Sequence, residues 1–124
     1  MKKLLMMAAT SAFLVSGLAA TEAMAGAEKK CKSCHNFSAK HKTGPGLKGI
    51  MDHDAGATDL KKYSKALKAG GWKWDDEHMR AWMCDSKKAI KAFTGDPKAK
   101  TKMAKQKICD TERQDEIIAF LRTL

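Results

Sequence analysis

Five consecutive residues, Cys31-Lys32-Ser33-Cys34-His35, have the types and spacing with the clearest chemical meaning in this chain. Two cysteines three positions apart can form thioethers with the two vinyl groups of one porphyrin. The histidine that follows them can place an imidazole nitrogen on the porphyrin iron. The motif therefore predicts one covalently attached haem c, held by Cys31 and Cys34, with His35 as the proximal ligand.

The same cysteine spacing is also found in two other kinds of site. In a thioredoxin-like redox pair the motif follows a β-strand, and no convincing strand precedes Cys31. A structural zinc site needs a second closely spaced pair of ligands, whereas Cys84 and Cys109 lie 25 residues apart. Haem attachment is therefore the interpretation that we favour.

Residues 1–25 have the features of a secretory signal peptide. Two lysines precede an apolar stretch from Leu4 to about Ala20, and Ala23-Met24-Ala25 offers small residues to a signal peptidase. We expect cleavage after Ala25, with cleavage after Ala20 as the alternative. A retained membrane anchor fits less well, because polar residues interrupt the apolar stretch and it is short for a membrane span. We therefore expect an exported, periplasmic protein.

Residues 26–124 then form a single small domain, whose core a buried porphyrin would enlarge. Removal of residues 1–25 leaves 22 basic and 13 acidic side chains. Such an excess of positive charge favours docking to acidic surfaces or anionic membranes, and it also occurs in proteins that bind nucleic acid. Because export and haem attachment argue against nucleic acid, we expect no nucleic-acid partner.

Three stretches after the haem motif have the periodicity of amphipathic helices. The first, residues 59–69, begins with Asp59 as an N-cap and ends at two glycines. The second, residues 74–84, begins with acidic side chains that suit the positive end of a helix dipole. The third, residues 111–124, begins with a capping-box pattern at Thr111-Glu112-Arg113-Gln114. Their apolar positions, which we expect to be buried, are Leu60, Tyr63 and Leu67; Met79, Trp82 and Met83; and Ile117, Ile118, Phe120, Leu121 and Leu124.

Two further motifs make a family resemblance specific. The segment Thr43-Gly44-Pro45-Gly46-Leu47-Lys48-Gly49-Ile50 follows the haem motif, and Thr101-Lys102-Met103 lies in a loop before the last predicted helix. With Cys-x-x-Cys-His, this order resembles the class I c-type cytochromes, the small soluble mono-haem cytochromes c of bacteria, over nearly all of residues 26–124. The resemblance implies an all-α small cytochrome c fold, with about four to five short helices wrapped round one covalently attached haem.

The resemblance also implies roles for particular residues. The carbonyl of Pro45 would accept a hydrogen bond from His35, which fixes the tautomer of the proximal ligand. The sulfur of Met103 would be the second axial ligand of the iron, so that His35 and Met103 together are the metal ligands. Tyr63 and Trp74 would reach a haem propionate, with core packing as the alternative for both rings.

The sequence departs from the family pattern in three places. Where the family has an arginine near a propionate, this chain reads Ile50-Met51-Asp52-His53, so either His53 stands in or one donor is missing. The usual Pro-Gly before the methionine motif is replaced by Lys98-Ala99-Lys100. Only residues 26–30 precede Cys31 after the favoured cleavage. The crossing of the N-terminal and C-terminal helices is therefore thinner than usual, or cleavage after Ala20 leaves a longer helix.

Cys84 and Cys109 bracket the Met103 loop and are left over once two cysteines hold a haem. In an oxidising compartment we expect them to form a disulfide. Closing a loop of this length stabilises a fold by roughly 3 to 4 kcal/mol on the chain-entropy model. Free buried thiols are one alternative, and a redox-active pair is another, although no surroundings that would lower a thiol pKa are evident.

Three lysines, Lys87, Lys88 and Lys91, lie where the family has residues near the exposed haem edge. They predict a docking face for redox proteins with acidic surfaces, such as a membrane cytochrome complex, an oxidase, a reductase or a dehydrogenase. A simple solvated face is the alternative for any such run of charges. We expect a monomer without stable membrane insertion.

The sequence thus predicts a periplasmic electron carrier, not an enzyme, that transfers single electrons through a haem with His/Met axial ligation. The first alternative is a high-spin haem protein with an open sixth position, either a peroxidase-like enzyme or a gas binder, which the altered loop before Met103 favours. In such a state His41, His53 or His78 could replace the methionine on the iron. A disulfide oxidoreductase that uses Cys84 and Cys109 is the third interpretation.

Overall fold

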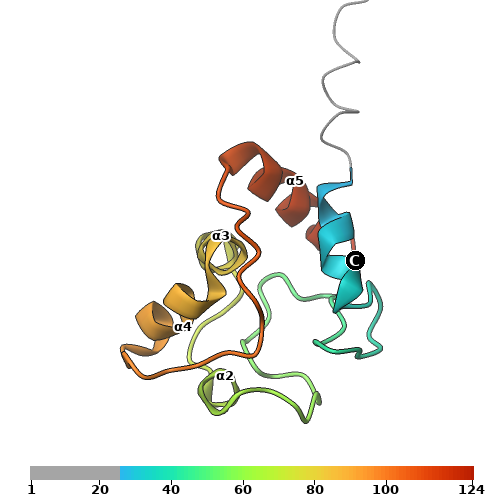
Figure 1. Ribbon diagram of the computed structural model, residues 1–124. Coiled ribbons are helices and arrows are strands. Elements are labelled where there is room, and N and C mark those ends of the chain that lie inside the picture. The colour runs from blue at the N-terminus through green and yellow to red at the C-terminus, as the bar shows by residue number, and fades with distance from the viewer. Residues whose placement is uncertain (1–25) are drawn as a thin grey trace, which may run out of the picture.

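The computed structural model describes residues 26–124. The predicted signal peptide, residues 1–25, lies outside the described residues. The described part is helical, and its extended pairing is limited to an isolated antiparallel bridge between Asp54 and Lys73. One 3₁₀ helix precedes four α-helices, in the order η1 (Ala27–Ser33), α2 (Lys65–Ala69), α3 (Asp76–Cys84), α4 (Ser86–Thr94) and α5 (Thr111–Arg122). The predicted all-α fold of four to five short helices is confirmed (Figure 1).

Within residues 26–124, no helix is both long enough and apolar enough to cross a membrane.

The two ends of the described chain pack together. Figure 1 shows η1 beside α5; α3 contacts both α5 and α4, and α2 contacts α4. Near this crossing the rings of Phe37 and Phe120 meet edge to face, with centroids 4.8 Å apart. None of the residues of η1 is buried. Ala27 and Cys31 are partly buried and pack against the core. A longer helix after cleavage at Ala20 would include residues outside the described ones, so the choice between the two sequence alternatives stays a prediction.

Asp85 separates two helices where the sequence predicts a helix followed by an open loop. Its backbone is extended (φ −150°, ψ 91°), which ends α3, and its carboxylate accepts a hydrogen bond from Lys88 N at 3.0 Å, which caps α4. Gly95, with φ 68°, ends α4 in the left-handed region. The structure therefore has a helix, α4, that the sequence analysis does not predict, and the three candidate docking lysines lie on it.

The predicted helix over residues 59–69 is wrong in its first half. The structure has a helix only from Lys65, because the hydroxyl of Ser64 caps it by accepting a hydrogen bond from Leu67 N at 3.2 Å. The carboxylate of Asp59, which the sequence makes the N-cap, instead contacts Nε2 of His41. Helix propensity depends on neighbouring residues in the chain, so it could not indicate this contact between two loops.

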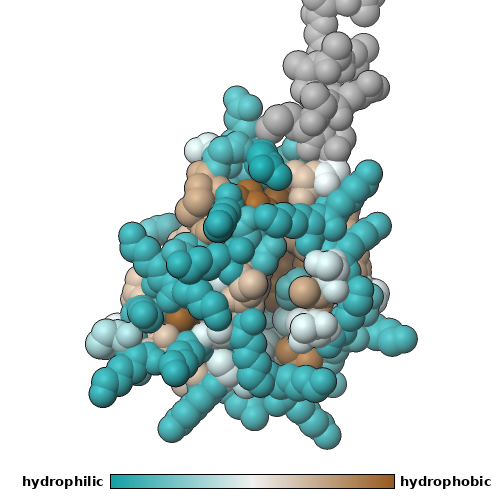
Figure 2. Space-filling view, in the orientation of Figure 1, coloured by the Kyte–Doolittle hydropathy of each residue, from teal (hydrophilic) through white to brown (hydrophobic). Residues whose placement is uncertain are grey.

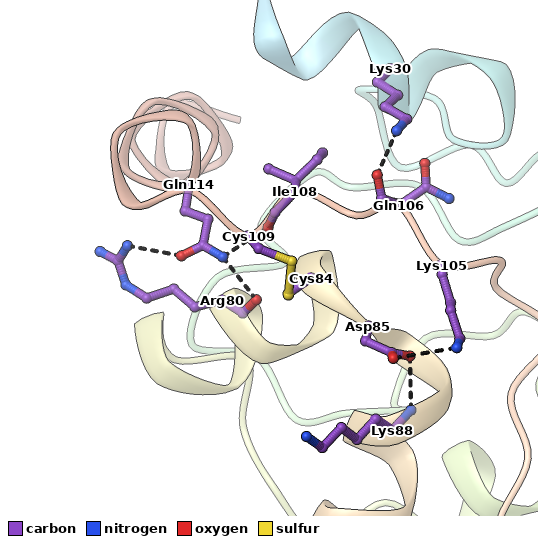
Figure 3. The surroundings of a disulfide bond; sticks show 10 residues. All are labelled: Lys30, Arg80, Cys84, Asp85, Lys88, Lys105, Gln106, Ile108, Cys109 and Gln114. Carbon is purple, nitrogen blue, oxygen red and sulfur yellow. Dashed lines mark hydrogen bonds and ion pairs between the residues drawn. A yellow bond between two sulfur atoms is a disulfide. The ribbon is translucent and has the colours of Figure 1, made fainter.

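The last helix begins as predicted, but a different side chain caps it. The carboxylate of Asp110 accepts a hydrogen bond from Arg113 N at 3.2 Å, so the cap lies one residue before the predicted one. Gln114, which the capping-box pattern turns back toward Thr111, points inward instead. Its amide donates to the carbonyl of Ile108 at 2.8 Å and is buried (Figure 3). This hydrogen bond ties α5 to the segment that leads into it.

The core is formed where the predicted apolar stripes face one another. The stripe of α3 is buried as predicted, and Ile117, Ile118 and Leu121 of α5 are buried with it. Phe120 and Leu124 are only partly buried. The indole of Trp74 packs between those of Trp72 and Trp82, with ring centroids 5.8 Å and 5.1 Å away. Part of this apolar core also forms the wall of a cavity.

Candidate haem-binding site

One cavity of about 250 Å³ lies between η1, α3, α5 and the loops that join the helices. Most of its wall is apolar, which excludes water and suits a large planar hydrophobic group. The apolar side chains of the wall are Leu47, Ile50, Leu60, Leu67, Trp74, Met79, Trp82, Met83, Ile117 and Leu121. Every residue that the sequence predicts to bind the cofactor also lines this cavity, namely Cys31, Cys34, His35, Pro45, Tyr63, Trp74 and Met103.

The two cysteines of the haem motif form no disulfide, and one hydrogen-bonded turn of backbone connects them. The N–H groups of Cys34 and His35 both donate to the carbonyl of Cys31, at 3.2 Å and 2.9 Å. Burial raises the pKa of the Cys31 thiol, and the charge of Glu28 raises it further. Reactive thiols of thioredoxin-like proteins have a lowered pKa. The raised pKa of Cys31 therefore argues against a thioredoxin-like redox pair.

His35 is oriented by a backbone carbonyl, as the resemblance implies. Its Nδ1 lies 2.8 Å from the carbonyl oxygen of Pro45, and because a carbonyl can only accept, Nδ1 carries the proton. Burial lowers the pKa of His35, although this hydrogen bond acts in the opposite direction. A neutral ring with Nδ1 protonated leaves the lone pair of Nε2 free for a metal.

The backbone of Gly44 also lies against this ring, and the sequence analysis did not single out this residue. A Cβ atom at residue 44 would lie 2.4 Å from Cε1 of His35, so any other residue would displace the imidazole. The Gly44 N–H also donates to the carbonyl of Cys34 at 2.7 Å. The position of this glycine directly before Pro45 was the signal that could have identified it.

Met103 reaches the same cavity from the loop between α4 and α5. Met79 and Met83 also line the cavity, but both are buried in the apolar stripe of α3. Met51 is only packed against the core and is not part of the cavity wall. Of the three methionines in the cavity wall, Met79 and Met83 belong to α3 and Met103 to a loop, which fits a ligand more than a core residue.

The two aromatic residues expected near a propionate differ in their surroundings. The hydroxyl of Tyr63 shares a hydrogen bond of 2.5 Å with the Thr58 hydroxyl. Trp74 is buried within the aromatic cluster of the core. His53 is exposed, lies outside the cavity wall and has only a long contact of 3.4 Å from Nδ1 to the carbonyl of Asp54. Whether His53 stands in for the family's arginine therefore stays a prediction.

The Met103 loop is fastened to the α3–α4 junction (Figure 3). A disulfide joins Cys84 to Cys109 with their Cα atoms 4.5 Å apart, as predicted, and these are not the cysteines of the haem motif. Beside it, Ile108 N donates to the carbonyl of Met83 at 3.1 Å. Lys105 also lies 3.5 Å from the carboxylate of Asp85. The loop therefore has covalent, backbone and ionic links to the same short segment.

Basic side chains contribute to the cavity and to the exposed face of α4. Lys30, Lys62 and Lys102 contribute to its wall, although the sequence analysis singled out none of them. Lys88 and Lys91 are exposed on α4. Figure 2 shows that hydrophilic side chains cover most of the visible face, with small apolar areas between them. The cavity wall is therefore mostly apolar but includes three basic side chains.

A helical fold around an apolar cavity, with a Cys-x-x-Cys-His turn in its wall, defines a c-type cytochrome. Cytochrome c2 of Rhodospirillum rubrum is 36% identical over 116 residues, which cover 88% of this chain and 85% of that protein. Cytochrome c2 of Cereibacter sphaeroides is 38% identical over 95 residues, which cover 66% of this chain and 77% of that protein. No protein-family model matches the chain. These identities and coverages place the chain in the class I cytochromes c, whose cofactor is one covalent haem c.

Solved structures lead to the same family. Cytochrome c2 from Rhodobacter sphaeroides superimposes with a TM-score of 0.73 at 34% identity, over 83% of this chain and 94% of that one. Cytochrome cH from Methylobacterium extorquens superimposes with a TM-score of 0.68 at 38% identity, over 83% of this chain and 97% of that one. The fold and the sequence therefore agree on the family.

The residues of the cavity fit the family's cofactor. Two free cysteines three positions apart have the sequence spacing for attachment to two vinyl groups, and the missing side chain of Gly44 leaves space for the proximal imidazole. The wall supplies apolar surface for a porphyrin, and its three lysines supply positive charge that would suit the propionates. Within the described residues, no group of three His, Cys, Asp or Glu side chains could hold a bare metal ion.

Proposed function

We propose that this chain is a periplasmic mono-haem electron carrier whose iron is bound by His35 and Met103. One observation carries the proposal. Both side chains, together with two free cysteines at haem-attachment spacing, line the same apolar cavity. The family supports a carrier of electrons and not an enzyme, because its named relatives are cytochromes c2.

In this proposal each residue has a positional task. Cys31 and Cys34 fix the cofactor to the chain, while Pro45 holds His35 in one tautomer and orientation. The soft thioether of Met103 stabilises ferrous over ferric iron and so raises the reduction potential. When bound, the haem supplies an iron that takes up and returns one electron. The apolar wall keeps water away and limits the reorganisation that electron transfer requires.

The compartment is also part of the proposal. Residues 1–25 have the composition of a signal peptide, and the Cys84–Cys109 disulfide is typical of an oxidising compartment. Partners there would be redox proteins with acidic docking surfaces, which the exposed lysines Lys88 and Lys91 on α4 attract. Nucleic acid has no role in this proposal.

The optical spectrum of the purified haem protein, in the ferric and ferrous states, tests the ligands. We expect a low-spin spectrum with the weak sulfur-to-iron band near the red end of the visible range. Met103→Ala should abolish that band. Met51→Ala should keep it, because Met51 is a partly buried methionine outside the cavity wall. A high-spin ferric spectrum with ready binding of carbon monoxide or peroxide would instead establish the gas-binding or peroxidase-like alternative.

A further inference from the structure

The first residue of α4 holds the backbone of the Met103 loop. Ser86 is completely buried, and its hydroxyl donates a hydrogen bond to the carbonyl of Met103 at 2.8 Å. A buried hydroxyl in the first turn of a helix normally has a local partner. Here the partner lies 17 residues away, in a loop, and belongs to the residue proposed as an iron ligand.

The second residue of α4 makes a parallel contact. The ammonium group of Lys87 donates to the carbonyl of Thr101 at 2.7 Å. Thr101 is itself buried, and its hydroxyl accepts a hydrogen bond from Met103 N at 3.3 Å. The backbone of residues 101–103 is therefore held at two carbonyls and one N–H. A sequence prediction that assigns Lys87 only to partner docking overlooks this contact.

We propose that Ser86, assisted by Lys87, is a positioning residue for the second axial ligand of the iron. This inference rests on the proposed function, because it requires Met103 to be that ligand. The two hydrogen bonds fix the loop backbone so that the Met103 side chain remains directed at the cavity. The family's usual Pro-Gly before the methionine is absent from this chain. The two hydrogen bonds make the loop rigid in its place.

The physical argument concerns the equilibrium between a closed and an open loop. Opening the loop must break both hydrogen bonds and leave the buried Ser86 hydroxyl without its partner, which is costly. Without Ser86 the closed state keeps an unpaired Met103 carbonyl, so the open state becomes relatively more populated. An external ligand that binds only the open state then gains apparent affinity in proportion to that population.

Titration of the ferric haem protein with imidazole measures this population directly. Imidazole competes with Met103 for the iron, and its binding removes the sulfur-to-iron band. For Ser86→Ala we expect imidazole to bind about ten-fold more tightly than to the parent protein, because one buried hydrogen bond is lost. Ser86→Thr keeps the hydroxyl and should bring the affinity back toward that of the parent.

Thr94→Val is the control for a general loss of stability. Thr94 lies at the other end of the same helix, where its hydroxyl donates to the carbonyl of Ile90 at 2.7 Å. Its removal should lower the denaturation midpoint without changing the affinity for imidazole. Equal affinities in Ser86→Ala and the parent protein would overturn the inference.

Lys87 keeps the inference testable even if Ser86 variants do not fold. Lys87→Gln should tighten imidazole binding about five-fold, whereas Lys88→Gln removes the same charge from the neighbouring position and should leave it unchanged. Equal effects of the two substitutions would refute the positioning role. If the parent protein lacks the sulfur-to-iron band, the assignment of Met103 is itself wrong and the inference falls with it. A parent protein that has the band while the variants bind imidazole normally refutes the inference alone.

Discussion

The backbone of Gly44 lies against the imidazole of His35, so that a Cβ atom at residue 44 would be 2.4 Å from Cε1 of the ring. Non-bonded carbon atoms pack at about 3.5 to 4.0 Å. The ring can therefore keep its hydrogen bond to Pro45 only while residue 44 has no side chain. Gly44 links two parts of the site, because its own N–H binds the carbonyl of Cys34.

Gly44→Ala should disturb the proximal ligand. We expect the free energy of unfolding to fall by about 1 to 3 kcal/mol, as overpacking does, and the spectrum of the ferric protein to change because the ring of His35 must move. Urea unfolding and the optical spectrum measure the two effects. Gly95→Ala is the control, since Gly95 has φ 68° but no atom within 4 Å of the added Cβ. It should lose stability without any spectral change. A normal spectrum in Gly44→Ala would contradict this role of the glycine.

The disulfide should stabilise the whole fold as well as the loop. Replacing Cys84 and Cys109 by alanine removes a link across a sequence separation of 25 residues. The chain-entropy model then predicts a loss of about 3 to 4 kcal/mol in the free energy of unfolding. Denaturant unfolding of the double variant, compared with the parent protein before and after reduction, provides the measurement. If the reduced parent protein is as stable as the oxidised one, the disulfide has no such effect.

The cap of α4 should make stability depend on pH. The hydrogen bond from Lys88 N lowers the pKa of the Asp85 carboxyl below its ordinary value of 3.8, and Lys105 lowers it further. A carboxyl whose pKa is lower in the folded state stabilises the fold above the unfolded pKa, and this contribution is lost as the pH falls through the folded pKa. The contribution of Asp85 should therefore be complete above about pH 4 and disappear in more acidic solution.

Asp85→Asn isolates this contribution, because asparagine can still accept the hydrogen bond from Lys88 N but does not titrate. The difference in unfolding free energy between the parent protein and this variant, measured by urea unfolding from pH 7 downward, should stay constant to about pH 4 and shrink below it. A difference that is independent of pH down to pH 2 would show that the charge of Asp85 is not involved.

Much of the site could be predicted from the sequence because its residues are close together in the chain. The haem motif is a single turn, and Pro45 follows His35 after ten positions. The stripe of Met79, Trp82 and Met83 is a local periodicity, so its burial needed no knowledge of the partner elements. These predictions depend on short-range rules that the rest of the chain does not override.

The remainder depends on contacts between distant segments, for which a single sequence has no local signal. α4 was missed because Asp85, whose extended backbone ends α3, also caps the next helix, and the lysines after it were interpreted only as a charged surface. Asp59 was wrongly made an N-cap because its contact with His41 crosses between two loops. The link from Ser86 to Met103 likewise joins a helix to a loop. The contacts of Asp59 and Ser86 join segments that are distant in the chain, whereas the Asp85 cap is a local hydrogen bond that the sequence analysis did not consider.

The lysines of α4 should control how fast the protein meets an acidic redox partner. Lys88 and Lys91 are exposed, whereas the Lys87 ammonium is engaged by the carbonyl of Thr101. Reversing both exposed charges, with Lys88→Glu and Lys91→Glu, should slow the second-order rate of electron transfer by about ten-fold at low salt. The difference should largely vanish near 1 M salt, where the Debye length falls to about 3 Å.

Lys40→Glu with Lys48→Glu is the matched control, because it makes the same change in net charge at two other exposed lysines. Both belong to the segment after the haem motif, which Figure 1 shows on the opposite side of the molecule from α4. If docking uses α4, stopped-flow rates at low salt should fall much more for the α4 pair than for this control, although the net charges are equal. Equal slowing by the two pairs would mean that only the overall charge matters. Slowing by the control alone would place the docking face on the side of the haem motif.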